Sequence, residues 1–242
     1  MPCKIVIPSR KRAGKVLTKV SGAILFVDEK EKAEYKKHYP DIEIETHKSL
    51  ASLSTIRQEI YSKFGDVFMV DDDISDVLQL YKVSNKSLDP DQAAKIIQKC
   101  YEQAKDLNAF LFGFNNDPVP THYNQHKPFM FQGYINGCAM GLRKSPHLYF
   151  SGKTIACESH WINCLNAYFH RYNFIDKRFC FQQKPGDTFK MLGGQTGKRT
   201  LESEKQDTLF LKEMFGDSIQ LKKSKNKTKQ LHEYQRELKV NL

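Results

Sequence analysis

Short apolar runs alternate with segments of helical spacing along most of the chain. The apolar runs predict strands at residues 4–8, 23–27, 42–45, 67–70, 109–114, 129–142 and 174–182. The segments between them predict helices at residues 28–39, 54–64, 89–107, 158–172 and 201–215. Such alternation is typical of parallel βαβ units. The pattern therefore predicts an α/β fold, with a mostly parallel, Rossmann-like sheet flanked by helices.

Two helix ends can be placed from their capping residues. Asp89 followed by Pro90 is a favoured helix start, because Asp accepts hydrogen bonds from the first turn and Pro suits the first helical position. Gly216 is expected to end the last helix. The run at 129–142 contains three glycines and is expected to form one or two interrupted strands.

Three adjacent carboxylates, Asp71, Asp72 and Asp73, follow the predicted strand at 67–70 directly. In an open parallel sheet, ligands bind beyond the carboxyl ends of the strands. A Mg²⁺ or Mn²⁺ ion would relieve the repulsion among these groups, bridge to a diphosphate and stabilise a departing phosphate. The simpler alternative is an acidic turn that caps a following helix.

Composition and charge narrow the class of protein. The 242 residues are 40% hydrophobic, which suits a globular α/β domain, and no apolar run is long enough for a membrane helix or signal peptide. The six cysteines form no CxxC pair, so we expect reduced, buried thiols in a soluble cytoplasmic protein. If the chain is phage-encoded, that compartment is the host cytoplasm.

The net charge of +10 is concentrated at the two ends of the chain. Residues 1–19 carry six Lys or Arg and no acid, and residues 222–242 carry seven Lys or Arg and two acids. The first cluster suggests phosphate binding near the first strand, and the second suggests a polyanionic partner. We therefore divide the chain into a domain at 1–221 and a basic tail at 222–242.

Several segments together resemble GT-A-fold nucleotide-sugar glycosyltransferases. IPSRKRAG after the first strand is similar to their first nucleotide-binding loop, and the apolar strand ending in Asp-x-Asp resembles their DxD motif. An Arg-bearing helix, SLASLSTIRQEI, precedes that strand, ESHWINCLNAYFHRY is similar to their Glu-Asp helix, and GGQTGKRT resembles a glycine-rich loop near the diphosphate. The closest resemblance, over residues 4–216, is to bacteriophage DNA-base glycosyltransferases found beside base-hydroxylating oxygenases.

The resemblance implies a role for each matching residue. Asp71 would contact the ribose. Asp71 and Asp73 would bind the metal ion, Mn²⁺ or Mg²⁺. Glu158 would be the catalytic residue on the acceptor side, although Ser159 stands where the family often has Asp. The remaining contacts to a nucleotide-diphosphate sugar, a UDP-sugar in our expectation, would come from Ser9, Arg10, Arg57, Asp72, Gly193, Gly194 and Arg199. The simpler interpretations are surface charges for Arg10 and Arg12, a helix-face ion pair near Glu59 or solvent contact for Arg57, a helix-end charge for Glu158 and a turn for the two glycines.

Three functional hypotheses follow. The first is a metal-dependent hexosyltransferase that glycosylates a hydroxymethylated pyrimidine in phage DNA, with the polar loop at 115–128 holding the base through His122 and Tyr123. The second is a nucleotidyltransferase acting on sugar phosphates. The third is a non-catalytic nucleic-acid-binding protein, which would bind DNA in a salt-sensitive manner without a metal. No membrane partner is expected, and no histidine has the spacing of a third metal ligand.

Overall fold

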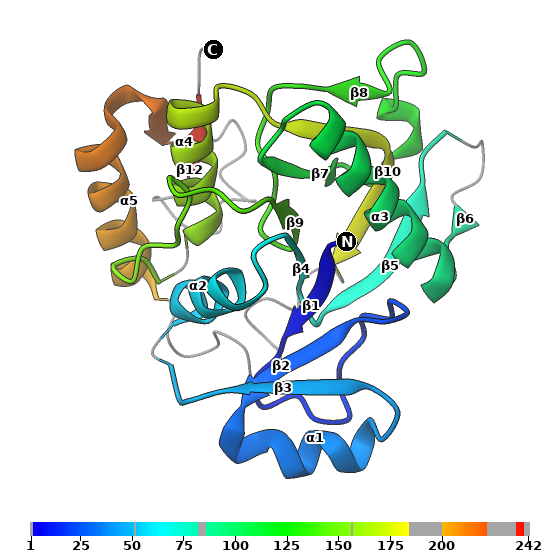
Figure 1. Ribbon diagram of the computed structural model, residues 1–242. Helices are drawn as coiled ribbons and strands as arrows, with labels where there is room; N and C mark the ends of the chain where they lie inside the picture. The colour runs from blue at the N-terminus through cyan, green and yellow to red at the C-terminus, as the bar shows by residue number, and fades with distance from the viewer. Residues whose placement is uncertain are drawn as a thin grey trace.

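The computed structural model describes residues 2–50, 52–81, 86–155, 157–183, 200–221 and 236–239. These residues form a ten-stranded mixed sheet covered by helices on both faces, and a second sheet of two short strands (Figure 1). The main path of the large sheet runs β3-β2-β1-β4-β9-β7-β10-β5-β6, and β8 pairs with β10 off this path. The predicted α/β class is confirmed.

The N-terminal half of the sheet is parallel throughout. Its strands are β1 (Lys4–Pro8), β2 (Ile24–Asp28), β3 (Glu43–His47) and β4 (Val67–Val70), and all three pairings among them are parallel. The carboxyl ends of these four strands therefore lie along one edge of the sheet. We call this edge the carboxyl edge.

The second half of the sheet is mixed. Strand β9 (Ala139–Leu142) runs antiparallel to both β4 and β7 (Leu111–Asn115), and β10 (Phe174–Gln183) runs parallel to β7. Strands β7 and β10 therefore also end at the carboxyl edge. The remaining strands are β5 (Ile74–Gln79), β6 (Lys86–Ser87) and β8 (Phe129–Met130), all paired antiparallel.

The helices divide between the two faces. Helices α1 (Lys32–His38) and α3 (Pro90–Asp106) pack into one hydrophobic cluster, and α2 (Leu53–Phe64), α4 (Glu158–His170) and α5 (Leu201–Phe215) pack into another. The short elements are η1 (Glu29–Glu31), η2 (Pro120–His122), η3 (Gly216–Ser218), β11 (Ile219–Leu221) and β12 (Arg236–Leu238). Figure 1 shows α2, α4 and α5 together on the side of the sheet away from α3.

The central strands are apolar throughout because both of their faces are covered. Along β4, Phe68 and Val70 enter the cluster with α1 and α3, whereas Val67 and Met69 enter the cluster with α2 and α4. All four side chains are 0% exposed. This alternation is the period of two that a pleated strand imposes.

Several local predictions are confirmed. Asp89 caps α3 with a hydrogen bond from Gln92 N, and Gly216 is the C-terminal cap of α5. All six cysteines are free and buried. The apolar run at 129–142 forms two strands, β8 and β9, and Gly141 lies inside β9 where a Cβ would come within 2.1 Å of Phe112 Cζ.

One alternative from the sequence is wrong. The acidic turn at 71–73 caps no helix, because it is followed directly by strand β5. At the other end of the chain, β12 lies in the predicted tail and pairs antiparallel with β11. Residues 222–235 lie outside the described residues, and the boundary after residue 221 stays a prediction.

Candidate functional site

The acidic turn lies at the carboxyl edge and is held there by backbone hydrogen bonds. Asp71 N donates to the carbonyl of Cys138 at 2.8 Å, and Leu17 N donates to the carbonyl of Asp72 at 2.9 Å. Thr18 Oγ1 also donates to the carbonyl of Asp71. The turn is therefore fixed between the loop that follows β1 and the segment that leads into β9.

The carboxylate of Asp72 binds the loop that follows β1. Its carboxylate accepts hydrogen bonds from Ser9 Oγ and Arg12 Nη1. The same loop is tied to Tyr35 on α1, whose hydroxyl lies 2.7 Å from Ser9 Oγ and accepts a 3.0 Å hydrogen bond from Arg12 N. Arg12 is 5% exposed, so its interpretation as a surface charge is wrong. Arg10, which we expect to contact the nucleotide, lies partly exposed on this loop.

Arg57 links the acidic turn to α4 and to the segment before β9. The side chain is 1% exposed. Its Nη2 donates to Asp71 Oδ1 at 2.6 Å, its Nη1 donates to the carbonyl of Gly137 at 2.6 Å, and its Nε lies 3.8 Å from Glu158 Oε1. Helix α2, which carries Arg57, starts with a capping box formed by Ser52 and Thr55.

Gly137 is the residue that sequence reasoning missed. A Cβ at this position would lie 3.1 Å from Ser159 Cβ and 3.3 Å from both Arg57 Nη1 and Glu158 Oε1. The absence of a side chain therefore lets the backbone sit against the Arg57–Glu158 pair. A glycine inside the apolar run at 129–142 was the only signal in the sequence, and it does not distinguish a close backbone approach from a turn.

The three carboxylates differ in accessibility. The side chain of Asp72 is 7% exposed, that of Asp73 12% and that of Asp71 23%. Asp73 accepts a 3.0 Å hydrogen bond from Gln183 Nε2 at the end of β10, and its Oδ2 lies 3.6 Å from Arg12 Nη1. Asp71 is thus the carboxylate of the turn that a ligand reaches most easily.

Among the described residues the cluster has an excess of negative charge. Its four carboxylates, Asp71, Asp72, Asp73 and Glu158, face two guanidinium groups, Arg12 and Arg57, which leaves a formal charge of −2 when all are ionised. Although Asp71 is the most exposed of the three acids, protein still surrounds most of its side chain, and this burial, together with the neighbouring carboxylates, raises the pKa of Asp71 to about 7 against the opposing effect of Arg57. Burial also raises the pKa of Asp72, although Arg12 and Ser9 oppose it.

A second polar cluster adjoins Glu158 in the first turn of α4. Tyr134 Oη lies 2.7 Å from Ser159 Oγ and 3.5 Å from His160 Nδ1. The rings of Tyr134 and His160 are 4.8 Å apart and tilted by 38°. Ser159, the departure from the expected Asp, is therefore hydrogen-bonded to Tyr134.

The structure brings Ser9, Arg57, the three aspartates and Glu158 together at one edge. Gly193, Gly194 and Arg199 lie outside the described residues. In the described ranges, no group of three or more His, Cys, Asp or Glu is arranged to hold a metal ion. No described helix is both long and apolar enough to cross a bilayer.

The family model described as TET-Associated Glycosyltransferase matches residues 3–172. The chain belongs to the TET-associated glycosyltransferase family. The matched segment runs from β1 to the end of α4 and contains Ser9, Arg12, Arg57, the acidic turn and Glu158. The resemblance found in the sequence is thereby confirmed at the level of the family, and the chain is a member of a family of glycosyltransferases.

Other comparisons add less. No curated protein matches the chain in sequence. A solved structure of CMP:2-keto-3-deoxy-manno-octonic acid synthetase complexed with CTP is 12% identical over 88% of this chain and 100% of its own, with a TM-score of 0.42. A cytidylyltransferase from Leptospira borgpetersenii is 10% identical over 60% of each chain, with a TM-score of 0.32. Likenesses at this level carry no argument about function.

Proposed function

We propose that this TET-associated glycosyltransferase moves a sugar, a hexose, from a nucleotide-diphosphate donor to the hydroxyl of a hydroxymethylated pyrimidine in DNA. The observation that carries the donor half of the proposal is the acidic cluster at the carboxyl edge, whose formal charge is −2 when all four carboxylates are ionised. In an open α/β sheet this edge is where nucleotides bind. We expect a UDP-sugar as the donor.

The carboxylate oxygens at this edge are suitable ligands for a Mg²⁺ or Mn²⁺ ion. Mg²⁺ is commonly bound by one or two carboxylates, with substrate phosphates and water completing its shell. Asp71 and Asp73 would hold the ion, since both oxygens of Asp72 accept hydrogen bonds from Ser9 and Arg12, whereas Arg57 and Gln183 bind Asp71 and Asp73 through one oxygen each. When bound, the ion would offset the excess charge of the cluster and stabilise negative charge on the leaving diphosphate.

The chain's own residues would orient the donor. Asp71 would accept a hydrogen bond from the ribose, and the loop that Asp72 holds would present Ser9 and Arg10 to the nucleotide. Arg57 would place a buried positive charge near the phosphates, where a low dielectric strengthens its effect. Gly193, Gly194 and Arg199 are expected to complete the diphosphate site, from a segment outside the described residues.

Glu158 is our candidate for the acceptor side. In the transfer, the acceptor oxygen forms a bond to the anomeric carbon, and the bond from that carbon to the diphosphate breaks with its electron pair leaving on the phosphate. The Glu158 carboxylate would orient the acceptor hydroxyl or take its proton. Ser159 cannot serve as that base, because a hydroxyl does not accept a proton at neutral pH as a carboxylate does.

The distribution of basic residues and the description of the family both support DNA as the acceptor. The positive excess is confined to residues 1–19 and 222–242, where lysines and arginines would neutralise phosphates without reading sequence. The family description associates these glycosyltransferases with TET enzymes, the base-hydroxylating oxygenases of the resemblance above. A hydroxymethyl group on a base supplies the nucleophilic oxygen that the reaction requires.

The test is transfer of radiolabelled sugar to DNA that contains hydroxymethylcytosine or hydroxymethyluracil, in the presence of Mn²⁺ and a panel of nucleotide sugars. Unmodified DNA of the same sequence is the control. We expect label only in the hydroxymethylated DNA. Absence of transfer across the whole panel would contradict the acceptor, and turnover of nucleoside triphosphate with sugar phosphate would favour a nucleotidyltransferase instead.

A further inference from the structure

The segment 131–138, which joins β8 to β9, is held in place by asparagine side chains. Asn163 of α4 clamps Ile135, since Ile135 N donates to its Oδ1 at 3.0 Å and its Nδ2 donates to the Ile135 carbonyl at 2.9 Å. Asn116 Nδ2 donates to the carbonyl of Tyr134 at 2.6 Å, and Asn173 Nδ2 donates to the carbonyl of Gly133 at 2.6 Å. We call this segment the strap.

The clamped strap fixes an aromatic side chain beside the first turn of α4. Tyr134 and His160 are both partly exposed and form a neighbouring ring pair at 4.8 Å. Tyr134 is oriented by Ser159, whose hydroxyl is 2.7 Å from its own. Phe131, on the same strap, is 47% exposed. The strap therefore offers ring surface to solvent on a backbone held by several independent hydrogen bonds.

The ring pair lies at the first turn of α4, the turn that begins with Glu158. Ser159 and His160 follow Glu158 directly in α4, and the strap's Gly137 lies against both Ser159 and Glu158. Gly137 also accepts the hydrogen bond from Arg57, which in turn binds Asp71. A group held on the Tyr134–His160 pair would thus lie beside the first turn of α4, in which Glu158 is the first residue.

The polar loop that sequence analysis selected is a weaker candidate for this role. His122 Nδ1 lies 2.7 Å from Asp117 Oδ2 within the loop itself. Tyr123 packs against a small buried cluster of Leu78, Leu80 and Cys180. His122 and Tyr123 therefore contact the loop itself and the neighbouring β5–β10 part of the sheet.

We propose that Tyr134 and His160 form the acceptor subsite, on which the ring of the hydroxymethylated pyrimidine packs so that its hydroxymethyl oxygen reaches Glu158. This inference rests on the proposed function. An enzyme that modifies a base inside a duplex must reach or flip that base, and a flipped base is commonly held by stacking on aromatic side chains. A ring on the fixed strap beside a ring on α4 suits this task, since stacking requires surface and little side-chain motion.

The test separates the ring of Tyr134 from its hydroxyl. Tyr134→Ala and His160→Ala are each expected to raise the acceptor KM about tenfold or more, which is within the range for loss of one base-stacking contact. Tyr134→Phe keeps the ring and is expected to stay within about threefold of wild type. Hydrolysis of the nucleotide sugar without acceptor, and the Kd for the donor, are expected to be unchanged in all three variants.

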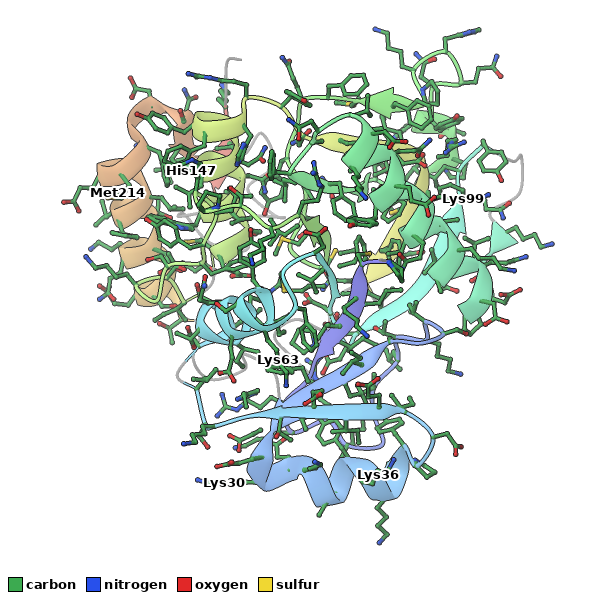
Figure 2. The ribbon with its side chains drawn as sticks, viewed as in Figure 1. Lys30, Lys36, Lys63, Lys99, His147 and Met214 are labelled. Atoms are coloured by element: carbon green, nitrogen blue, oxygen red, sulfur yellow. The ribbon has the colours of Figure 1, made fainter. Side chains whose placement is uncertain are left out.

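Matched controls come from the far end of the same helix and from a residue that packs against it. Tyr168 is 67% exposed on α4, and His147 stacks on Phe169 at 4.6 Å beside the C-terminal half of that helix (Figure 2). Tyr168→Ala and His147→Ala remove the same two kinds of ring at a distance from Glu158. Their acceptor KM is expected to equal that of wild type.

The possible outcomes are distinct. Wild-type acceptor KM in both Tyr134→Ala and His160→Ala would overturn the subsite while leaving the proposed function intact. An equal loss in Tyr134→Phe and Tyr134→Ala would also overturn it, because the hydroxyl and not the ring would then be responsible. If a thermal unfolding measurement shows that Tyr134→Ala is not folded, the acceptor KM of His160→Ala alone decides whether the subsite is correct. Failure of the proposed function itself is recognised separately, since wild-type protein would then transfer no sugar to hydroxymethylated DNA.

Discussion

Arg57 and Asp71 form a 2.6 Å ion pair that ties helix α2 to the end of strand β4. The same guanidinium reaches Gly137 and Glu158, so a single buried side chain connects both halves of the proposed site. The three adjacent aspartates are tolerated at the end of a buried strand partly because Arg12 and Arg57 offset two of the charges. The remaining excess of negative charge is what a divalent cation would relieve.

Removing the Arg57 charge is expected to destabilise the fold strongly. Arg57→Met would leave Asp71 and Glu158 without their buried partner, and breaking such a pair typically costs about 3–5 kcal/mol of unfolding free energy. Lys63→Met is the control on the same helix (Figure 2). Lys63 pairs with Glu45 at 2.8 Å, and both side chains are exposed. Its cost is expected to be below about 1 kcal/mol. Urea unfolding measures both, and equal costs would contradict the role of Arg57.

The raised pKa of Asp71 predicts a specific pH dependence of stability. Its folded pKa is about 7 because of burial and neighbouring carboxylates, whereas an unfolded Asp titrates near pH ~3.9. Between those values the folded protein holds a proton that the unfolded chain releases, so this group lowers the unfolding free energy as pH rises. Asp71→Asn removes that titration. The unfolding free energy of the variant, relative to wild type, should therefore increase from pH 5 to pH 8, and a constant difference would contradict the shift.

Asp73 is expected to be needed for metal and not for folding. In Asp73→Asn the amide oxygen can still accept the hydrogen bond from Gln183, so the melting temperature should change little. Affinity for Mn²⁺ in the presence of UDP, measured by calorimetry, should fall, and transfer should fall about a hundredfold or more with the lost charge. Asp41→Asn, at an exposed acid, is the control. Full activity of Asp73→Asn, or of wild type in EDTA, would refute a metal at this position.

Gly137→Ala is expected to impair transfer more than stability. The added Cβ meets Arg57, Glu158 and Ser159 at 3.1–3.3 Å, a distance at which these side chains must shift by a few tenths of an ångström. Small displacements in a preorganised site can cost about 10²-fold in rate. Gly152→Ala is the control, since its Cβ meets only Thr55 Cγ2, at an ordinary 3.7 Å. Comparable kcat values in the two variants would show that the close approach at Gly137 is not needed for catalysis.

The fold was predictable where strands are buried on both faces or where caps are explicit. β1 and β4 match their predicted bounds, because four or five consecutive apolar residues bounded by polar turns leave little choice. β5 was missed because ISDVLQ mixes polar and apolar residues. Its extended conformation comes from pairing with β10, where Leu78 lies opposite Cys180. A pairing between residues about a hundred positions apart is not visible in a local pattern.

The site was predictable in its position but not in its contacts. An apolar strand ending in acids marks the carboxyl edge, and the resemblance selected Ser9, Arg57 and Glu158. The partners of the acids depend on the tertiary fold, since Arg12 meets Asp72 from 60 positions away and was equally consistent with a surface charge. Likewise, the pairing of Tyr134 with Ser159 depends on how the strap crosses α4.

The last prediction concerns the basic tail. Lys222, Lys223, Lys225, Lys227 and Lys229 are five of the seven basic residues in 222–242. Replacing all five with Gln removes charge and leaves the β11–β12 pairing residues 219–221 and 236–238 unchanged. For duplex DNA, each phosphate neutralised adds about 0.9 to the negative slope of log affinity against log salt. If these lysines contact phosphates, the variant should bind hydroxymethylated and unmodified DNA more weakly to the same extent, with a flatter slope, because phosphate contacts do not read the base. Hydrolysis of the free nucleotide sugar should be unaffected, since that reaction needs no DNA.

The matched control for the tail variant replaces five lysines elsewhere with Gln and changes the net charge equally. They are Lys30, Lys32, Lys36, Lys37 and Lys99, on η1, α1 and α3. A salt slope that falls equally in both variants would mean that net charge, and not the tail, attracts the DNA.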